Sequence, residues 1–254
     1  MSIKSKKIIV TGGCGYIGVK LVEHFLKKKF KVTVIDTQWF GKNLKKNKNL
    51  RIIKKDIREL EEKHFKNIYA VFHLANIAND PAVELKPELS WEVNVLSSMK
   101  IIEFCIKSKV KKFFFASSGS VYGIKKEKKV TESLSLEPIS VYNKTKMIAE
   151  RIFLSYEKNI KLYIVRPATV CGVSTRQRLD VSVNALTISA LKNNVINVFG
   201  GQQIRPNIHI DDMVNVYDHL FFKNCPSGIY NAGFENYSIK KIANSVAKIT
   251  KAKI

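Results

Sequence analysis

Short apolar runs alternate with amphipathic segments along the first two thirds of the chain. Such runs are typical of buried strands, and they occur near residues 7–11, 31–36, 50–54, 69–74, 112–117 and 161–166. Between them, apolar residues recur at helical spacing, which predicts helices from about residue 16, over 89–108 and over 141–157. Strands that alternate with helices build a parallel sheet covered by helices on both faces. The pattern therefore predicts an α/β, doubly wound fold.

A glycine-rich stretch joins the first predicted strand to the first helix. Residues 11–18 read Thr-Gly-Gly-Cys-Gly-Tyr-Ile-Gly, directly after Ile8-Ile9-Val10. A strand that turns sharply into a helix needs glycine, and the helix N-terminus then offers unpaired N–H groups and a positive dipole to a phosphate. Asp36 closes the next strand, where a carboxylate can accept both ribose hydroxyls of an adenine dinucleotide and would repel a 2′-phosphate. The stretch therefore predicts NAD binding in preference to NADP.

Asp56 follows the third predicted strand and has two interpretations of equal weight. Its carboxylate can contact the adenine amino group of the dinucleotide, or it can cap the N-terminus of a helix.

The alternation of apolar runs and helical patterns becomes less regular after Pro167. The patterns that follow predict a polar loop at 174–180, a helix at 181–193 and a short strand at 195–199. They also predict a helix from 209 that is capped by Asp211 or Asp212, a late strand at 229–231 and a final helix from about 238. We therefore predict two parts. Residues 1–167 and 208–232 form an NAD-binding Rossmann domain, and residues 168–207 and 233–254 form a smaller substrate-binding subdomain.

Charge and cysteine content narrow the class of protein. The chain has 254 residues, 44 basic and 21 acidic, with a net charge of +23. Lysines predominate among the basic residues and are spread along the chain, whereas proteins that recognise nucleic-acid sequences concentrate arginine and aromatic residues on one element. We therefore expect a solvated lysine surface that attracts anionic small molecules and binds no specific nucleic acid. The four cysteines lie far apart, which favours reduced thiols in the cytoplasm over a disulfide frame or a metal site, and no apolar run predicts a signal peptide or a membrane span.

The sequence Tyr142-Asn143-Lys144-Thr145-Lys146 contains the spacing Tyr-x-x-x-Lys. The same spacing recurs at Tyr16, Tyr122 and Tyr237, but only Tyr142 opens a helix downstream of the fifth strand, whose end carries Ser117-Ser118-Gly119-Ser120. Ligands of doubly wound sheets bind outside the carboxyl ends of the strands, so these hydroxyls face the cofactor crevice. Residues four apart share one helix face, so the Lys146 ammonium lies beside the Tyr142 phenol and favours its deprotonation near neutral pH.

Together, these motifs resemble the extended short-chain dehydrogenase/reductases that act on nucleotide sugars. The similarity covers essentially the whole chain and includes residues 11–18, Asp36, Asp56-Ile57, Val71-Phe72-His73-Leu74-Ala75, Asn94, residues 117–123, residues 142–146, Arg166-Pro167 and His209-Ile210-Asp211-Asp212.

The resemblance implies roles for individual residues. Ser118 would be the hydroxyl partner of the sugar oxygen, Tyr142 the acid/base, and Lys146 the anchor of ribose and phenol. Ser118, Ser120, Arg205 and Arg178 would bind the substrate; Arg205 would pair with its diphosphate, and Arg178 is a weaker candidate. The dinucleotide would contact Gly12, Gly15, Tyr16, Ile17, Gly18, Asp36, Asp56, Ile57, Leu74, Ala75, Asn94, Tyr142 and Lys146.

Two features depart from the family pattern. Dehydratases of the family carry an acidic residue shortly after the catalytic hydroxyl, whereas this chain has Gly119 and Ser120, which argues against dehydration. The printed chain also stops after one short helix, where relatives continue with more substrate-binding structure. We therefore expect a substrate pocket that is incomplete or closed by a partner subunit.

The resemblance predicts an NAD-dependent nucleotide-sugar 4-epimerase that works through a transient 4-keto sugar in surface polysaccharide precursor synthesis. A nucleotide-sugar 4-ketoreductase would use the same residues, and net consumption of reduced cofactor separates the two. A dinucleotide-binding protein that has lost catalysis is the second alternative. As in relatives, the helices near 89–108 and 141–157 would form a homodimer interface.

Overall fold

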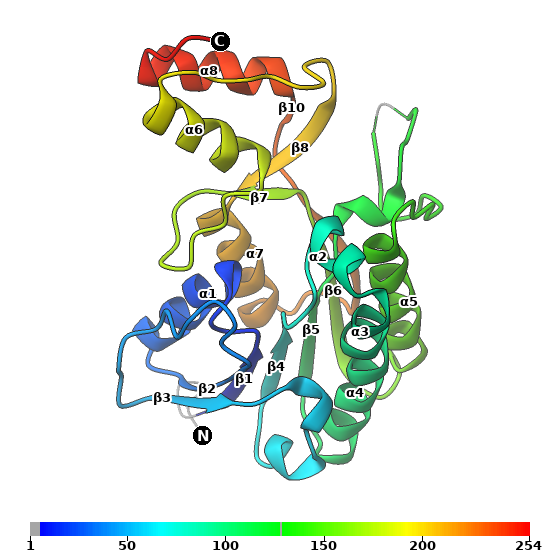
Figure 1. Cartoon of the computed structure of the whole chain (residues 1–254). Helices are drawn as coiled ribbons and strands as arrows, with labels where there is room; N and C mark the ends of the chain where they lie inside the picture. The colour runs from blue at the N-terminus through cyan, green and yellow to red at the C-terminus, as the bar shows by residue number, and fades with distance from the viewer. Residues whose placement is uncertain (1–5, 128) are drawn as a thin grey trace.

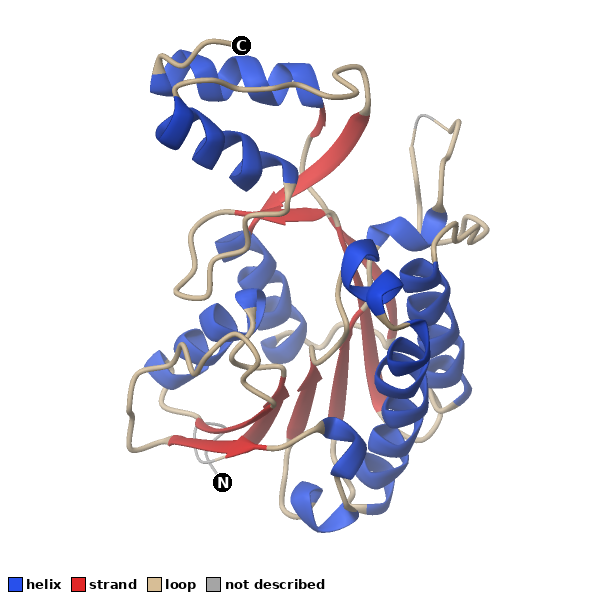
Figure 2. Ribbon diagram, viewed as in Figure 1, coloured by secondary structure: helices blue, strands red, loops and turns tan. Residues whose placement is uncertain are grey.

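The central element is one parallel sheet whose strand order is β3-β2-β1-β4-β5-β6-β9. The computed structural model describes residues 6–127 and 129–254 (Figures 1 and 2). The strands are β1 (Lys7–Thr11), β2 (Lys31–Asp36), β3 (Leu50–Lys54), β4 (Ala70–His73), β5 (Lys112–Ala116), β6 (Lys161–Pro167) and β9 (Gly228–Ala232). The order reverses at β1, which pairs with both β2 and β4. Such a reversal opens a crevice at the carboxyl ends of the strands. The predicted doubly wound fold is confirmed.

Helices cover both faces of this sheet, as Figure 1 shows. One face packs on α1 (Tyr16–Lys27) and α7 (Ile210–Phe222), the other on α4 (Ser97–Lys107) and α5 (Val141–Ser155). Successive strand residues point to opposite faces. Phe114 therefore joins the first core, while its neighbours Phe113 and Phe115 join the second.

The predicted helix at 89–108 is interrupted. It consists of α3 (Pro87–Trp91), a π-helical turn (Glu92–Leu96) and α4. The backbone N–H of Ser97 bonds to the carbonyl of Glu92, and the Ser97 hydroxyl donates to the same oxygen at 2.9 Å. The pattern of apolar residues did not reveal the π-turn, because such a turn inserts one residue without ending the helix. The remaining short helices are α2 (Asp80–Leu85), η2 (Ile57–Glu59), η3 (Glu62–Phe65) and η5 (Gly119–Tyr122).

A smaller unit lies at the top of Figure 1, beyond the carboxyl ends of the strands. Its mixed sheet, in the order β10-β8-β7, contains β7 (Thr169–Cys171), β8 (Ile204–His209) and β10 (Asn236–Ser238). The helices α6 (Ser182–Asn193) and α8 (Ile239–Thr250) share a separate core that includes Ala190, Ile196, Ile242 and Ala243. We propose that the two predicted domains correspond to these units, although β8 crosses the boundary predicted at residue 208.

Two predictions for this second half are wrong. The strand expected at 195–199 is absent from the described residues: Val195 forms only an isolated bridge with Lys253. The α7 cap is His209, whose ring accepts from the N–H of Asp211 at 3.3 Å, so neither Asp211 nor Asp212 caps that helix. Asp211 pairs instead with Lys20 at 2.9 Å, because α1 runs beside α7.

None of the helices that the structure describes is long and apolar enough to cross a membrane.

Phe114→Ala tests the central stack. The Phe114 ring is fully buried, with centroids 4.4 Å from that of Phe72 and 4.8 Å from that of Tyr163. Because its removal leaves a cavity between two rigid rings, we expect a loss of about 3–5 kcal/mol in the free energy of unfolding, measured by urea denaturation. The matched control is Phe199→Ala, whose side chain is 85% exposed and whose loss should change little. Equal stabilities of the two variants would contradict this account of the core.

Candidate active site

The glycine-rich turn leaves room for backbone only. Gly12 has φ +71°, and a Cβ there would lie 2.6 Å from the N of Ala75, in the loop after β4. A Cβ on Gly18 would collide with the carbonyl of Gly12. The turn therefore packs tightly between β1 and β4, and α1 begins at Tyr16 with its N-terminus at the crevice (Figure 1). This cradle fits the pyrophosphate of a dinucleotide, which needs close backbone approach and free N–H groups.

The Asp36 carboxylate accepts backbone hydrogen bonds from the glycine-rich turn and from the residues that follow β2. Its Oδ2 accepts from the N–H of Cys14 at 3.0 Å, and its Oδ1 accepts from the N–H of Gln38 at 2.7 Å. Each carboxylate oxygen keeps further acceptor capacity, as a ribose diol requires. Burial and the Asp36 charge raise the pKa of Cys14 to about 12, so that thiol stays protonated at neutral pH.

Two buried side chains brace the loop after β4, to which Leu74 and Ala75 belong. Asn94, from the π-turn, accepts from the N–H of Ile77 at 2.9 Å and donates to its carbonyl at 3.2 Å and to Thr145 at 3.0 Å. Asn94 is fully buried, so a role in cofactor binding would act through the loop rather than by direct contact. His73 lies between the Thr11 hydroxyl (2.7 Å) and the Ser98 hydroxyl (2.9 Å), and burial lowers the pKa of its ring to about 3.

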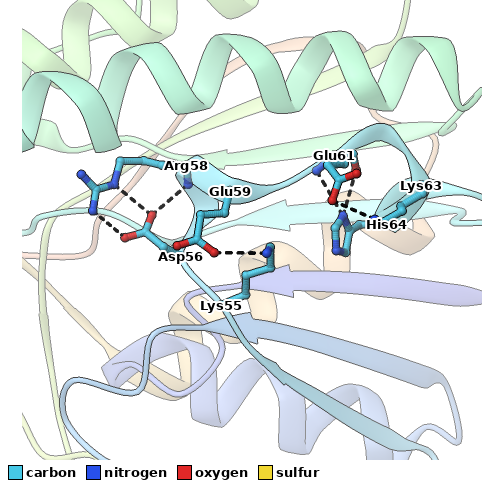
Figure 3. Close-up of polar contacts among 7 residues, drawn as sticks. All are labelled: Lys55, Asp56, Arg58, Glu59, Glu61, Lys63 and His64. Atoms are coloured by element: carbon cyan, nitrogen blue, oxygen red, sulfur yellow. Dashed lines mark hydrogen bonds and ion pairs between the residues drawn. The ribbon is translucent and has the colours of Figure 1, made fainter.

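The structure shows the capping role of Asp56 (Figure 3). Its Oδ1 accepts from the N–H of Arg58 at 2.8 Å, and its Oδ2 lies 2.9 Å from the Arg58 guanidinium. Burial works to raise the pKa of Asp56, but the bonds from Arg58 hold it below the usual value. The neighbouring Ile57 is buried, and adenine contact by this pair stays a prediction. Figure 3 also shows the Lys55–Glu59 ion pair (3.1 Å) and His64 bonded to the backbone of Glu61.

Serine hydroxyls cluster at the carboxyl end of β5. Ser118 caps η5, and its Oγ lies 2.7 Å from the Oγ of Ser120. Ser120 in turn donates to the Oδ1 of Asn143 at 2.5 Å. Tyr142, in the first turn of α5, stands next to this cluster, and Ser140 caps the helix. Burial raises the pKa of Tyr142, while the charge of Arg178 and the Ser118 hydroxyl work to lower it. The predicted hydroxyl and phenol are therefore neighbours.

Lys146 lies one turn further along α5. Its Nζ donates to the carbonyl of Ala116 at 2.6 Å and lies 5.9 Å from the centre of the Tyr142 ring. The side chain is almost fully buried, and burial lowers the pKa of Lys146 to about 7, although the carboxylate of Glu150 works to raise it. This ammonium can therefore lose or hold its proton near neutral pH.

The predicted substrate arginines differ in their surroundings. Arg178 forms two hydrogen bonds of 2.9 Å with Asp180, which also accepts from Asn79 at 2.7 Å. Arg205 is exposed on β8 of the smaller unit, with its Nε 3.1 Å from Gln203. Arg178 thus lies where its charge acts on Tyr142, whereas the structure records no such effect of Arg205 among the described residues.

A link between the glycine-rich turn and the smaller unit was not predicted from the sequence. The Tyr16 hydroxyl donates to the carbonyl of Gly172 at 2.7 Å and accepts from Asn184 at 3.1 Å. Ser174 donates to the Tyr16 carbonyl at 2.9 Å. The family motif marked Tyr16, but no local pattern identifies partners that lie more than 150 residues away, as the separations of 156 and 158 show.

The buried Glu150 was also not predicted: it accepts from Ser117 and from Arg166, beneath the predicted catalytic residues. The available signal was its spacing, four residues after Lys146 on one helix face. Among the residues that the structure describes, no three His, Cys, Asp or Glu side chains gather as metal ligands would.

Comparison with known proteins places this geometry in a family. The sequence model of the "NAD dependent epimerase/dehydratase family" matches residues 8–233. The chain is 32% identical to the "Uncharacterized UDP-glucose epimerase YtcB" of Bacillus subtilis, over 96% of this chain and 82% of that one.

Solved structures agree. A UDP-N-acetylglucosamine 4-epimerase from Methanobrevibacter ruminantium superposes with a TM-score of 0.92 at 26% identity, over 99% of this chain and 85% of that one. The UDP-glucuronic acid 4-epimerase of Bacillus cereus, in complex with UDP-glucuronic acid and NAD, gives 0.87 at 30% identity, over 98% and 85%. The chain therefore belongs to the NAD dependent epimerase/dehydratase family, as an NAD-dependent enzyme of the nucleotide-sugar class.

Proposed function

We propose that this enzyme is a nucleotide-sugar 4-epimerase, with Tyr142 as its acid/base. The observation that carries the proposal is the convergence of Ser118, Tyr142 and Lys146 at the end of β5, on the carboxyl side of the sheet where the glycine-rich turn opens. The names of the relatives support the reaction class, since those compared above are epimerases of UDP-sugars.

The chemistry follows from the three side chains. When bound, NAD supplies the acceptor and later the donor of a hydride. Tyr142, as phenolate, takes the proton of the sugar 4-hydroxyl while the hydrogen on C4 leaves as hydride, which forms a 4-keto sugar. Ser118 holds the sugar oxygen by a hydrogen bond, and Lys146 stabilises the phenolate. After the keto sugar turns over, hydride returns to its other face and Tyr142 returns the proton.

Epimerisation is favoured over dehydration because Gly119 and Ser120 provide no second acid after Ser118. We propose a nucleotide-diphosphate sugar as substrate, with Arg178, Arg205 and Ser120 as further contacts, and a place in cytoplasmic surface polysaccharide precursor synthesis. The decisive assay incubates the protein with UDP-, dTDP-, CDP- and GDP-sugars, with and without NAD. Product epimer without net reduction of NAD supports the epimerase, whereas stoichiometric reduction of NAD to NADH, with oxidation of the sugar to its 4-ketone, identifies a 4-ketoreductase running in reverse.

We also propose a homodimer through α4 and α5, which lie side by side on one face of the sheet (Figure 1). Paired helices of two subunits would form a four-helix bundle across a two-fold axis. Sedimentation at micromolar concentration should give the mass of two chains, and a mass of one chain, 28.9 kDa, would contradict the proposal.

Tyr142→Phe is expected to reduce turnover by about a hundred- to ten-thousand-fold, because it removes the group that moves the proton and keeps the ring. NAD binding, followed by fluorescence titration, should survive. Ser118→Ala should cost less, since the base remains in place. The matched control is Tyr237→Phe, because Tyr237 has the same spacing to Lys241, whose Nζ lies 4.1 Å from its ring centre. Wild-type turnover of Tyr142→Phe would sink the assignment.

Asp36→Asn tests the cofactor preference. The amide keeps an acceptor for the N–H of Cys14 or Gln38 but removes the charge that repels a 2′-phosphate. We expect the preference for NAD over NADP to narrow by about tenfold, which corresponds to about 1.4 kcal/mol. Asp212→Asn, exposed in the first turn of α7, is the control and should leave the ratio unchanged. Tighter binding of NADP than NAD by the wild-type protein would overturn the argument.

A further inference from the structure

We propose that Glu150 is a positioning residue for catalysis: it fixes the end of β5 that carries Ser118 and supplies the counter-charge for the Lys146 ammonium. The inference rests on the proposed function, because it concerns how Tyr142 is kept active as a base. Glu150 itself touches neither the Tyr142 phenol nor the Ser118 hydroxyl in any contact recorded among the described residues.

The carboxylate lies at the centre of a buried network. Glu150 is fully buried on α5 and accepts two bonds from Arg166 on β6, at 3.0 Å from Nε to Oε1 and 2.6 Å from Nη2 to Oε2. Its Oε1 also accepts from the Ser117 hydroxyl. Arg166 continues the network, donating to the Tyr122 hydroxyl at 2.7 Å. A buried carboxylate with several charge-assisted bonds is held in one orientation.

Ser117 connects the buried Glu150 network to the residues of the proposed site. It lies between Ala116, whose carbonyl accepts from Lys146, and Ser118. The Ser117 N–H donates to the carbonyl of Val165 at 2.8 Å, so backbone and side chain are both fixed. The bond to Glu150 therefore orients the peptide units on either side of Ser117, one that receives the ammonium and one that leads to Ser118.

Charge gives Glu150 its second role. The groups around Lys146 are Tyr142 and Glu150 on its own helix and His73 on β4, which burial keeps neutral. Arg178 and Asp80 act on Tyr142 from other elements, and Arg166 neutralises part of the Glu150 charge. Glu150 follows Lys146 by four residues on α5, on the same helix face, and its charge works against burial to keep the amine protonated. Since the pKa of Lys146 is already lowered to about 7 in the presence of this carboxylate, its loss would leave the amine neutral at neutral pH.

Glu150→Gln is the direct test, read out by the NMR titration of lysine labelled with carbon-13 at Cε, taken as the difference between each protein and its Lys146→Met counterpart. We expect the apparent pKa of Lys146 to fall by about one pH unit or more, because its counter-charge is lost. Glu150→Asp keeps the charge and should restore the apparent pKa of Lys146 to within a few tenths of a unit of the wild type.

Two further variants separate positioning from simple stability. Ser117→Ala alters no charge and should lower kcat several-fold while KM and the apparent pKa of Lys146 stay unchanged; wild-type kcat would overturn the positioning role. Should Glu150→Gln fail to fold because Arg166 is left unpaired, the double variant Glu150→Gln, Arg166→Met removes the pair as a unit and should show the same direction of shift.

An unshifted titration of Lys146 in whichever of these variants folds would overturn the charge role. The NMR titration needs no substrate, so it remains decisive even where no nucleotide sugar is turned over. Failure of the inference is thereby separate from failure of the proposed function.

Discussion

The parallel pairing of β1 with both β2 and β4 is the constraint on which the rest of the site depends. Because the strand order reverses at β1, the connections leave on opposite faces of the sheet and open a crevice at its carboxyl edge. The turn after β1 must then fit between two strands, which is why a Cβ at Gly12 would meet the backbone of Ala75. Asp36, at the end of β2, and Ser118, beyond the end of β5, reach the same edge for the same reason. Topology, rather than local sequence, brings them together.

Two buried lysines near opposite ends of β5 show how surroundings decide what a cation does. The Lys112 Nζ donates to the carbonyl of Phe221, at the C-terminus of α7, at 2.7 Å, where the helix dipole favours a positive charge. Lys146 bonds to the carbonyl of Ala116, but its neighbours are a phenol and a carboxylate. Burial lowers the pKa of both amines. Of the two, Lys146 is the one that lies beside Tyr142, the proposed acid/base, so it is the lysine to whose counter-charge we assign a functional role.

The sequence was sufficient for the six strands that consist of apolar runs, because buried parallel strands leave little choice of composition. It was also sufficient for α1 and α5, but it predicted neither α2 nor the π-turn that interrupts the helix at 89–108. The sequence did not predict β7, β8 and β10, which are short strands. Within β8, the residues Arg205-Pro206-Asn207 are typical of a loop. The sequence also failed for Glu150. A glutamate in a helix normally faces solvent, and its burial here is decided by Arg166, a residue 16 positions later on a strand. The local periodicity of a sequence does not indicate which side chains of different elements pair with one another.

The link at Tyr16 joins the two units mechanically. Its ring begins α1, where a phosphate would lie, while its hydroxyl bonds to Gly172 and Asn184 and its carbonyl to Ser174. Asn184 also donates to the carbonyl of Arg178 at 2.8 Å, so the segment that holds this arginine is tied to the glycine-rich turn by side-chain bonds. A displacement of either segment must break or carry along the other. The cradle for the cofactor and the loop whose charge acts on Tyr142 are therefore one bonded assembly, although they come from opposite halves of the chain.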